Sequence, residues 1–291
     1  MARHDRRDFL KLAGIAGVTF TAGLFPGRFA AAQSANDFHF VQFSDTHWGY
    51  KGPANPDAEH TLEKAVATVN GLATRPDFIV FTGDLTHTTD DGKERRARMR
   101  RFKEIVSALS VKDVRFMPGE HDASLDKGEA FKEFFGATHW TFDHKGVHFV
   151  ALDNVSDPAA KLGEEQLAWL AADLKQRKPD DRIVVFTHRP LFDLVPNWDW
   201  TTADGAKAID LLMPYQNVVV FYGHIHQEHH HMTGHIRHHA AKSLIFPQAA
   251  PGTAPKRPPP LPFDASLKPL GTRDVAVSSK VTITELPVTR A

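Results

Sequence analysis

Short apolar runs rich in β-branched and aromatic residues recur along the chain, and most are followed by a stretch whose apolar residues have helical spacing. The runs lie at Phe38–Phe43, Phe78–Thr82, Val114–Met117, Val147–Leu152, Ile183–Thr187 and Val218–Tyr222. Each has the length and composition of a buried strand. The helical patterns lie at Ala58–Ala73, Gly92–Leu109, Asp126–Phe135, Glu164–Arg177 and Ala206–Met213. Strands that alternate with helices predict an α/β protein with a mainly parallel sheet covered by helices.

Two further segments modify this picture. Asp143–Gly146 separates two strand-like runs and predicts a tight hairpin, so the sheet should be mixed. Six prolines in residues 251–262 predict an extended connector that follows a single domain at residues 33–250. The remainder of the 251–291 tail contains Asp274–Val277 and Lys280–Leu286, from which we expect one or two edge strands.

The first 32 residues have the three parts of an export signal: a basic start, an apolar stretch and small residues at Ala30 and Ala32. The apolar stretch, Leu12–Phe25, is shorter than the ~20 residues that span a bilayer, so we expect no stable membrane span. The run Arg6-Arg7-Asp8-Phe9-Leu10-Lys11 resembles the twin-arginine signal of bacteria. We therefore expect residues 1–32 to engage the twin-arginine export machinery and to be removed, which gives a periplasmic or secreted protein.

Composition limits the chemistry that is possible. The chain has no cysteine, so disulfides, thiolate ligands and cysteine nucleophiles are excluded, and a metal must be held by imidazole and oxygen ligands. The 35 basic and 35 acidic residues balance, so the chain lacks the positive field that binds phosphate backbones. We expect no nucleic acid among its partners.

Potential metal ligands stand directly after several predicted strands. They are Asp45 and His47, then Asp84, then Glu120 with His121 and Asp122, then His188, and finally His224 with His226. Ligands bind where the strands of an α/β sheet end, and residues i and i+2 of an extended chain point to one side. One Asp-x-His pair is a weak signal, but its repetition at successive strand ends predicts a shared site.

The ordered set Asp-x-His, Gly-Asp, Gly-x-His-Asp, His and Gly-His-x-His resembles the calcineurin-like metallophosphoesterases over about residues 38–240. The resemblance implies a mixed two-sheet β-sandwich flanked by helices, with four α/β/β/α layers and a dinuclear metal centre at the strand ends. It implies a phosphoester hydrolase whose substrate is a small-molecule phosphodiester or phosphomonoester.

The resemblance also implies residue roles. Asp45, His47 and His226 would hold the first of two metal ions, Glu120, His188 and His224 the second, and Asp84 would bridge both. The ions would be iron, manganese or zinc, and a hydroxide shared between them is the expected nucleophile. His121 would lie beside the scissile phosphate as a catalytic residue. Asp122 would either hold His121 protonated or cap the next turn.

One residue departs from the family pattern, which usually has asparagine where this chain has Glu120. The extra negative charge predicts a trivalent–divalent metal pair, or weak hydrolysis that favours singly charged diesters. Glu120 also leaves open two alternatives with little or no hydrolysis: a metal-handling protein and a redox protein on the same dinuclear scaffold.

Two groups of aromatic side chains have open interpretations. The histidines from His229 to His239 could form an accessory metal patch, but the turn at Thr233-Gly234 predicts a hairpin that splits them between two faces. Trp48, Trp198 and Trp200 stand on loops near the motif residues, where they could stack on a substrate or pack the loops.

Overall fold

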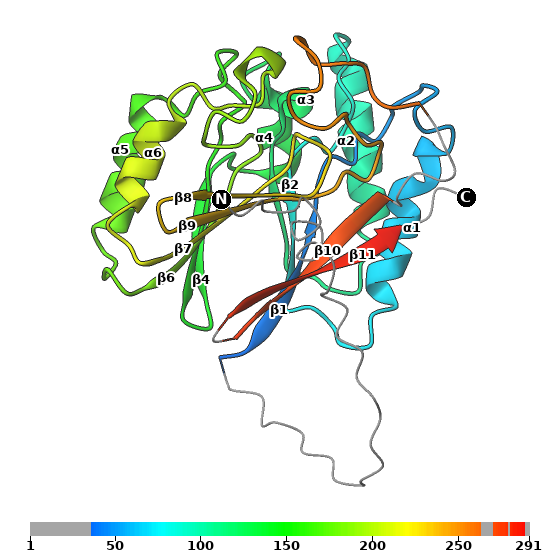
Figure 1. The fold of residues 1–291 in the computed structure, drawn as a ribbon. Helices are drawn as coiled ribbons and strands as arrows, with labels where there is room; N and C mark the ends of the chain where they lie inside the picture. Colours follow the sequence, from blue (N-terminus) through cyan, green and yellow to red (C-terminus); the bar gives the residue numbers. More distant parts are fainter. Residues whose placement is uncertain (1–35, 263–269, 279, 289–291) are drawn as a thin grey trace, which may run out of the picture. The chain divides into compact units, whose positions relative to one another are not determined.

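The structure is a computed structural model that describes residues 36–262, 270–278 and 280–288. Within the described residues the chain forms two β-sheets flanked by helices (Figure 1). Residues 1–32, where we predict the export signal, lie outside the described residues. In the part that is described, no helix has both the length and the apolar character needed to cross a membrane.

The first sheet has the strand order β11-β10-β1-β2-β3. Its strands are β1 (Phe38–Phe43), β2 (Phe78–Thr82), β3 (Val114–Met117), β10 (Leu270–Val277) and β11 (Val281–Val288). β1, β2 and β3 are parallel, whereas β10 runs antiparallel to β1 and to β11. Helix α1 (Ala58–Asn70) connects β1 to β2, and α2 (Gly92–Val106) connects β2 to β3. The short α3 (Glu120–Ala123) and α4 (Glu129–Phe135) follow β3 and lead to the second sheet.

The second sheet has the order β4-β5-β6-β7-β9-β8. Its strands are β4 (Trp140–His144), β5 (Val147–Ala151), β6 (Arg182–Phe186), β7 (Asn217–Tyr222), β8 (His229–Thr233) and β9 (Ile236–Ala240), and its helices are α5 (Gly163–Leu174) and α6 (Gly205–Leu212). β4 and β5 join through Lys145 and Gly146, whose φ angles of 45° and 76° make the predicted tight hairpin turn.

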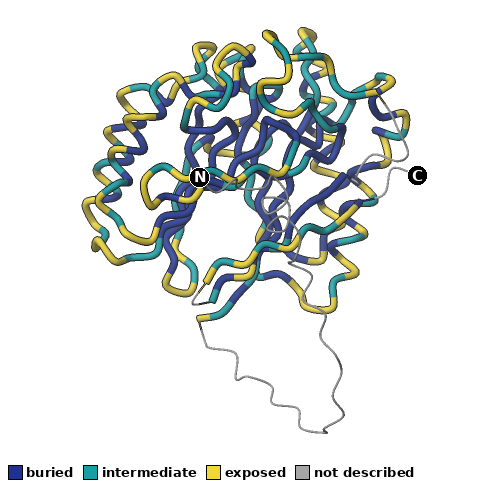
Figure 2. Tube along the Cα trace, in the orientation of Figure 1, coloured by how far each residue is buried: buried dark blue, intermediate teal, exposed yellow. Residues whose placement is uncertain are grey.

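The sheets face each other across an aromatic core. Phe40 of β1 meets phenylalanines of β5, β6 and β7 edge to face, with ring centroids 5.7–6.0 Å apart. A second core lies between the first sheet and α1, α2 and α4, and a third between the second sheet and α5 and α6. Figure 2 shows the strands buried between helices that are exposed on their outer faces. The four α/β/β/α layers are those implied by the family resemblance.

The described part of residues 251–291 contributes more to the first sheet than the sequence predicts. β11 is the one edge strand that this described part supplies, within the expected one or two, whereas β10 lies inside the sheet between β11 and β1. Both strands are longer than the segments predicted at 274–277 and 280–286. The first sheet thus includes strands that lie beyond residue 250.

Candidate metal centre

The predicted ligand residues converge at the carboxyl ends of the parallel strands of both sheets. Asp45 and His47 follow β1, Asp84 follows β2, Glu120 follows β3, His188 follows β6, and His224 and His226 follow β7. The loops of the two sheets meet at this end, since His224 N–H donates to Asp45 Oδ1 at 3.1 Å and Leu244 N–H donates to Ser44 O at 3.2 Å.

The first ligand group consists of Asp45, His47, Asp84 and His226, all buried, with one ligand atom from each lying within 4.8 Å of the others. His47 Nε2 lies 3.3 Å from Asp84 Oδ2, and His226 Nε2 lies 3.3 Å from Asp45 Oδ1. The two imidazole nitrogens are 3.2 Å apart. The group contains the three residues that the family resemblance assigns to the first metal, together with Asp84 as the bridge.

The second group consists of Asp84, Glu120, His188 and His224, within the same 4.8 Å limit. Glu120 Oε1 lies 2.9 Å from His224 Nδ1, and Glu120 Oε2 lies 2.9 Å from His188 Nε2. Asp84 Oδ2 lies 3.4 Å from His188 Nε2, although the two residues are more than a hundred positions apart in sequence. Asp84 belongs to both groups, as a bridging carboxylate must.

The ligand residues hold an uncommon backbone conformation. Five of them have positive φ angles: Asp45 (53°), His47 (41°), Asp84 (51°), His224 (67°) and His226 (55°). A non-glycine residue in this region costs about 1 kcal/mol or more, and it persists only where the surroundings enforce it. The conformation turns successive side chains inward, and its concentration at this one place is typical of a functional site.

The glycines of the motifs are required by close contacts between the loops. A Cβ on Gly119 would lie 2.0 Å from Asp84 Oδ1, and a Cβ on Gly83 would lie 2.3 Å from His188 Nδ1. Gly83 also has a φ of 97°. Any larger residue would push a ligand away from the centre, so these glycines allow the loops to approach.

Three ligand histidines have their outward nitrogen fixed by a backbone carbonyl. His188 Nδ1 bonds to Thr82 O at 2.7 Å, His226 Nδ1 to Phe246 O at 2.8 Å, and His224 Nε2 to Asp199 O at 3.0 Å. Because a carbonyl only accepts, each of these nitrogens carries the proton. The other nitrogen of each ring is thereby left to face the centre, as in protein metal sites.

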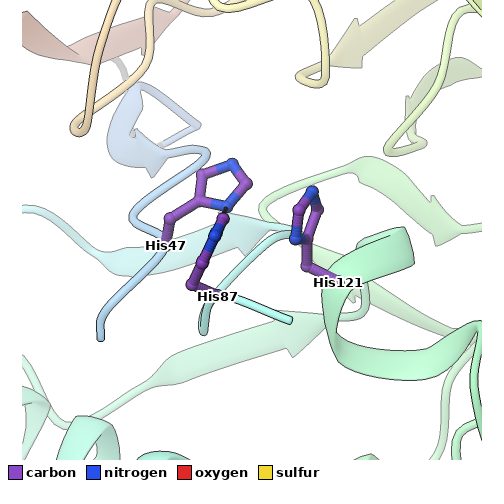
Figure 3. A group of neighbouring side chains, drawn as sticks. All are labelled: His47, His87 and His121. Atoms are coloured by element: carbon purple, nitrogen blue, oxygen red, sulfur yellow. Dashed lines mark hydrogen bonds between the residues drawn. The ribbon is translucent and has the colours of Figure 1, made fainter. Parts of the chain in front are cut away.

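His47 is different because its outward Nδ1 faces another imidazole. His87 Nδ1 lies 3.3 Å from His47 Nδ1, and the ring of His87 stacks on His121 with centroids 5.0 Å apart (Figure 3). His47 and His87 come from two separate loops and His121 from the short helix α3, and their rings gather close together. Burial, the largest cause, lowers the pKa of His87 to about 4, so His87 is neutral and its Nδ1 can accept a hydrogen bond from His47 Nδ1–H.

The donor set fits a metal pair. Glu120 Oε2, His188 Nε2 and His224 Nδ1 are buried and make no hydrogen bond among the described residues, although the Glu120 carboxylate lies 2.9 Å from each of the two nitrogens. Atoms gathered this closely without hydrogen bonds are suited to ligating a cation between them. Burial alone would lower the pKa of His188, but Asp84 and Glu120 raise it well above its ordinary value. A cation would replace that proton. Imidazole and carboxylate ligands suit zinc, iron and manganese.

His121 lies beside the centre, with Nε2 4.0 Å from Asp84 Oδ2 and a quarter of its side chain exposed. Its Nδ1 accepts a hydrogen bond from the Thr88 backbone N–H at 3.2 Å and lies 2.5 Å from Thr88 Oγ1. Since Nδ1 is the acceptor, the proton is on Nε2, which faces the centre. His121 therefore offers a neutral N–H donor.

The pairing expected between Asp122 and His121 is wrong. Asp122 is buried, and its carboxylate accepts from the backbone N–H groups of Leu85, Thr86 and Gly119 at 2.9, 2.9 and 3.0 Å. It joins the loop after β2 to the start of α3. The alternative prediction, that Asp122 caps this turn, matches the structure.

A pocket of about 470 Å³ opens over both ligand groups. Its wall includes Tyr50, Phe246, Arg257 and Pro258–Pro260. The prolines belong to residues 247–261, which we call the proline strap. Leu261 N–H donates to Pro247 O at 3.3 Å, and Trp198 Nε1 donates to Ala254 O at 2.9 Å, so the strap is tied at its base and in the middle.

The tryptophans are not the aromatic residues of this pocket. Trp198 and Trp200 are buried, with ring centroids 5.0 Å apart, and they pack the loop that holds Asp199. Trp48 lines a neighbouring cavity. Of the two interpretations drawn from the sequence, loop packing describes Trp198 and Trp200, and Tyr50 and Phe246 occupy the pocket wall instead.

Residues 38–228 match the calcineurin-like phosphoesterase family, and this match covers most of the chain. The chain belongs to that family. It is a metallophosphoesterase, and dependence on a dinuclear metal centre is a property of the family.

Relatives by sequence include phosphodiesterases. The chain is 30% identical over 201 residues to a probable glycerophosphodiester phosphodiesterase of Arcobacter nitrofigilis, a match that covers 64% of this chain and 71% of the relative. It is 29% identical over 232 residues to a 3′,5′-cyclic adenosine monophosphate phosphodiesterase of Pseudomonas aeruginosa, with 74% and 78% covered.

Solved structures share the fold. A dimetal phosphatase from Danio rerio has a TM-score of 0.57 at 16% identity, over 87% of this chain and 99% of that one. A purple acid phosphatase from yellow lupin has a TM-score of 0.61 at 14% identity, over 83% of this chain and 49% of that one. At these identities the likeness concerns the fold alone.

Three further residues at the site were not predicted from the sequence: His87, Arg189 and Arg257. His87 follows Asp84 by three positions and Arg189 follows His188 directly, so proximity to a motif was the available signal. Arg257 lies in the proline-rich segment that was interpreted only as a connector. Its position over the pocket depends on how the proline strap is tied down, which no local pattern shows.

Proposed function

We propose that this metallophosphoesterase hydrolyses a small phosphodiester, or a small phosphomonoester, after export from the cytoplasm. One observation carries the proposal: two ligand groups that share Asp84 lie at the floor of a pocket of about 470 Å³. This volume suits a small molecule. The proline strap over the pocket argues against an extended protein substrate.

The chain's own residues prepare the pocket for a phosphate. Two cations held by the ligand groups would supply positive charge to the phosphate oxygens and make water more acidic. His121 adds an N–H donor at the edge of the centre, because Thr88 fixes the proton on Nε2. A neutral imidazole of this kind can hydrogen-bond a phosphoryl oxygen and stabilise its developing charge.

The wall of the pocket favours a substrate with a further polar or anionic group. Among the described residues that line it, Arg257 is the only lysine or arginine. It precedes three prolines, whose fixed φ angles restrict the backbone that carries it. Glycerophosphodiesters and cyclic nucleotides, named for two relatives, carry polar groups next to a phosphodiester and are the first substrates to test.

The test is hydrolysis by the purified, metal-loaded chain that starts at residue 33. Bis(p-nitrophenyl) phosphate, p-nitrophenyl phosphate, a glycerophosphodiester and a cyclic nucleotide should be compared, with Asp84→Asn as the inactive control. We expect turnover of at least one diester that Asp84→Asn abolishes. Binding of two metal ions without hydrolysis of any ester would instead favour the metal-handling alternative.

Export is proposed from the sequence of residues 1–32. Replacement of both Arg6 and Arg7 by lysine should retain the full-length precursor inside bacterial cells that possess the twin-arginine machinery. The parent chain should be found in the periplasmic or extracellular fraction in its shortened form. Export of the double variant at the parent rate would contradict a twin-arginine route.

A further inference from the structure

Arg189 is a buried cation beside the second ligand group, outside the set of metal ligands. Its side chain is 7% exposed, and Nη2 lies 3.8 Å from Glu120 Oε2. Nη1 lies 2.5 Å from Asp199 Oδ1 and donates to Asp199 O at 2.9 Å. A buried guanidinium is costly unless it faces negative charge, so its position requires an explanation.

The contacts of Arg189 close a ring around one side of the centre. Glu120 Oε1 lies 2.9 Å from His224 Nδ1, and His224 Nε2 donates to the same Asp199 carbonyl that accepts from Arg189. Asp199 itself has a φ of 66°, which directs its carbonyl and its carboxylate to these two partners. Glu120, His224, Asp199 and Arg189 therefore hold one another in place.

These four residues also affect the net charge of the metal centre. Asp45, Asp84 and Glu120 are the carboxylates of the two ligand groups. The Asp199 side chain is 56% exposed, so water screens its charge. Arg189 and Glu120 are shielded from solvent and close together, where charges interact strongly. Glu120 with Arg189 has no net charge, as would a neutral ligand at that position.

We propose that Arg189 is the charge-balancing partner of Glu120, so that the centre keeps two divalent ions and still attracts a phosphate anion. The inference rests on the proposed function for its phosphate ligand. With the guanidinium beside Glu120, the extra carboxylate requires neither of the outcomes expected from the sequence, a trivalent–divalent metal pair or weak hydrolysis that favours singly charged diesters. Arg189 acts as a positioning residue, through Glu120.

The test is a double-variant cycle read by binding rather than turnover. Arg189→Gln, Glu120→Asn and the combined variant are loaded with Mn²⁺ or Zn²⁺. The metal ions per chain are counted by mass spectrometry of the metals, and the dissociation constant of inorganic phosphate is measured by calorimetry. Circular dichroism confirms that each variant is folded, and Arg189→Lys serves as the variant that keeps the charge.

Arg189→Gln should keep its metal but bind phosphate at least tenfold more weakly, because Glu120 is then uncompensated. Glu120→Asn should bind the second metal at least tenfold more weakly, because the guanidinium then repels it. The combined variant should recover both properties to within a few-fold of the parent, and Arg189→Lys should resemble the parent.

Two results would overturn the proposal. One is a combined variant whose metal and phosphate affinities fall by as much as the falls in the two single variants multiplied together. The other is equal phosphate affinities for Arg189→Lys and Arg189→Gln. Failure of the proposed function is distinguishable from both. It would appear as a parent protein that binds metal and inorganic phosphate with the expected coupling but hydrolyses no ester.

Discussion

The loop from Gly223 to His226 and the β8–β9 hairpin are neighbours in sequence and rich in histidine, yet they differ in what they can bind. In the loop, His224 and His226 have positive φ angles and point into the metal centre. In the hairpin the backbone is extended, and His230 pairs with His239 and His231 with His238 across the ladder. Alternation then sends neighbouring rings to opposite faces.

The loop and the hairpin also differ in the carboxylates that lie near their histidines. The loop histidines meet Asp45, Asp84 and Glu120 from other strands, whereas the hairpin's close carboxylate is Glu228, 3.2 Å from His230 Nε2. Among the described residues, no group of three or more potential ligands includes a hairpin histidine. The accessory metal patch considered from the sequence therefore has no ligand group here. Backbone conformation and nearby carboxylates, more than the number of histidines, create the site.

The largest effect should come from removing the charge that both ligand groups share. Asp84→Asn should lose bound metal and lower hydrolysis by about 10³-fold or more, since electrostatic stabilisation at the reacting phosphate is lost. His230→Ala, on the hairpin, should keep the parent metal content and rate. Metal analysis and diester hydrolysis measure both, and equal metal loss in the two variants would contradict the comparison.

His121→Ala should lower turnover by ~10²–10⁴-fold while two metal ions remain bound, because His121 faces the pocket without belonging to the two dinuclear groups. Thr88→Val is the matched control. It removes Oγ1 but keeps the backbone N–H that fixes the His121 proton, so it should cost much less. If His121→Ala lost metal in proportion to activity, His121 would be a ligand and the role assigned to it would be wrong.

His87 should affect the first metal position only. His87→Phe keeps an aromatic ring for stacking on His121 but removes the acceptor for His47 Nδ1, so we expect metal affinity at this position to fall by about tenfold. His87→Asn, whose amide oxygen can accept, should recover part of the loss. Competition with a chelator measures the affinity. Identical curves for the parent and both variants would show that His87 does not position His47.

Much of this molecule follows from local sequence. The runs that become β1, β2 and β3 are predicted at their observed bounds, because buried parallel strands are continuous apolar segments. The ligands follow from their places after these strands. Residues that depend on long-range contacts do not follow. β10 pairs with β1 more than two hundred positions away, and nothing in its local pattern distinguishes an inner strand from an edge strand.

The net charge at the metal centre also depends on long-range contacts that the local sequence does not show. Glu120 is visible in the sequence as an extra carboxylate, but the guanidinium that faces it comes from the loop after β6, in the other sheet. Asp122 shows the converse. Its neighbour in sequence, His121, suggested a pair, but the folded backbone presents three N–H groups that bind the carboxylate more directly. In both cases the role of the residue depends on contacts with residues that are distant in sequence.

The last expected effect concerns stability at acid pH and belongs to the hairpin. His238 is fully buried, and neither ring nitrogen has a hydrogen-bond partner among the described residues. Burial lowers the pKa of His238 to about 3. Between pH 6.5 and 3 the unfolded chain therefore binds a proton that the folded chain does not. The stability contributed by neutral His238 is complete above pH 6.5 and is lost as the pH falls, by about 2 kcal/mol at pH 5.

His238→Phe should remove this dependence, since the replacement ring packs beside Phe192 without a titrating group. The free energy of unfolding is measured in urea at pH 7.5 and at pH 5. From the higher to the lower pH it should fall by about 2 kcal/mol less in the variant than in the parent. His230→Phe, on the exposed side of the same hairpin, should behave as the parent does. Acid release of metal affects all three proteins alike and cancels in the comparison. An equal fall in the free energy of unfolding of all three proteins would mean that solvent reaches His238 in the folded hairpin and that His238 is protonated there.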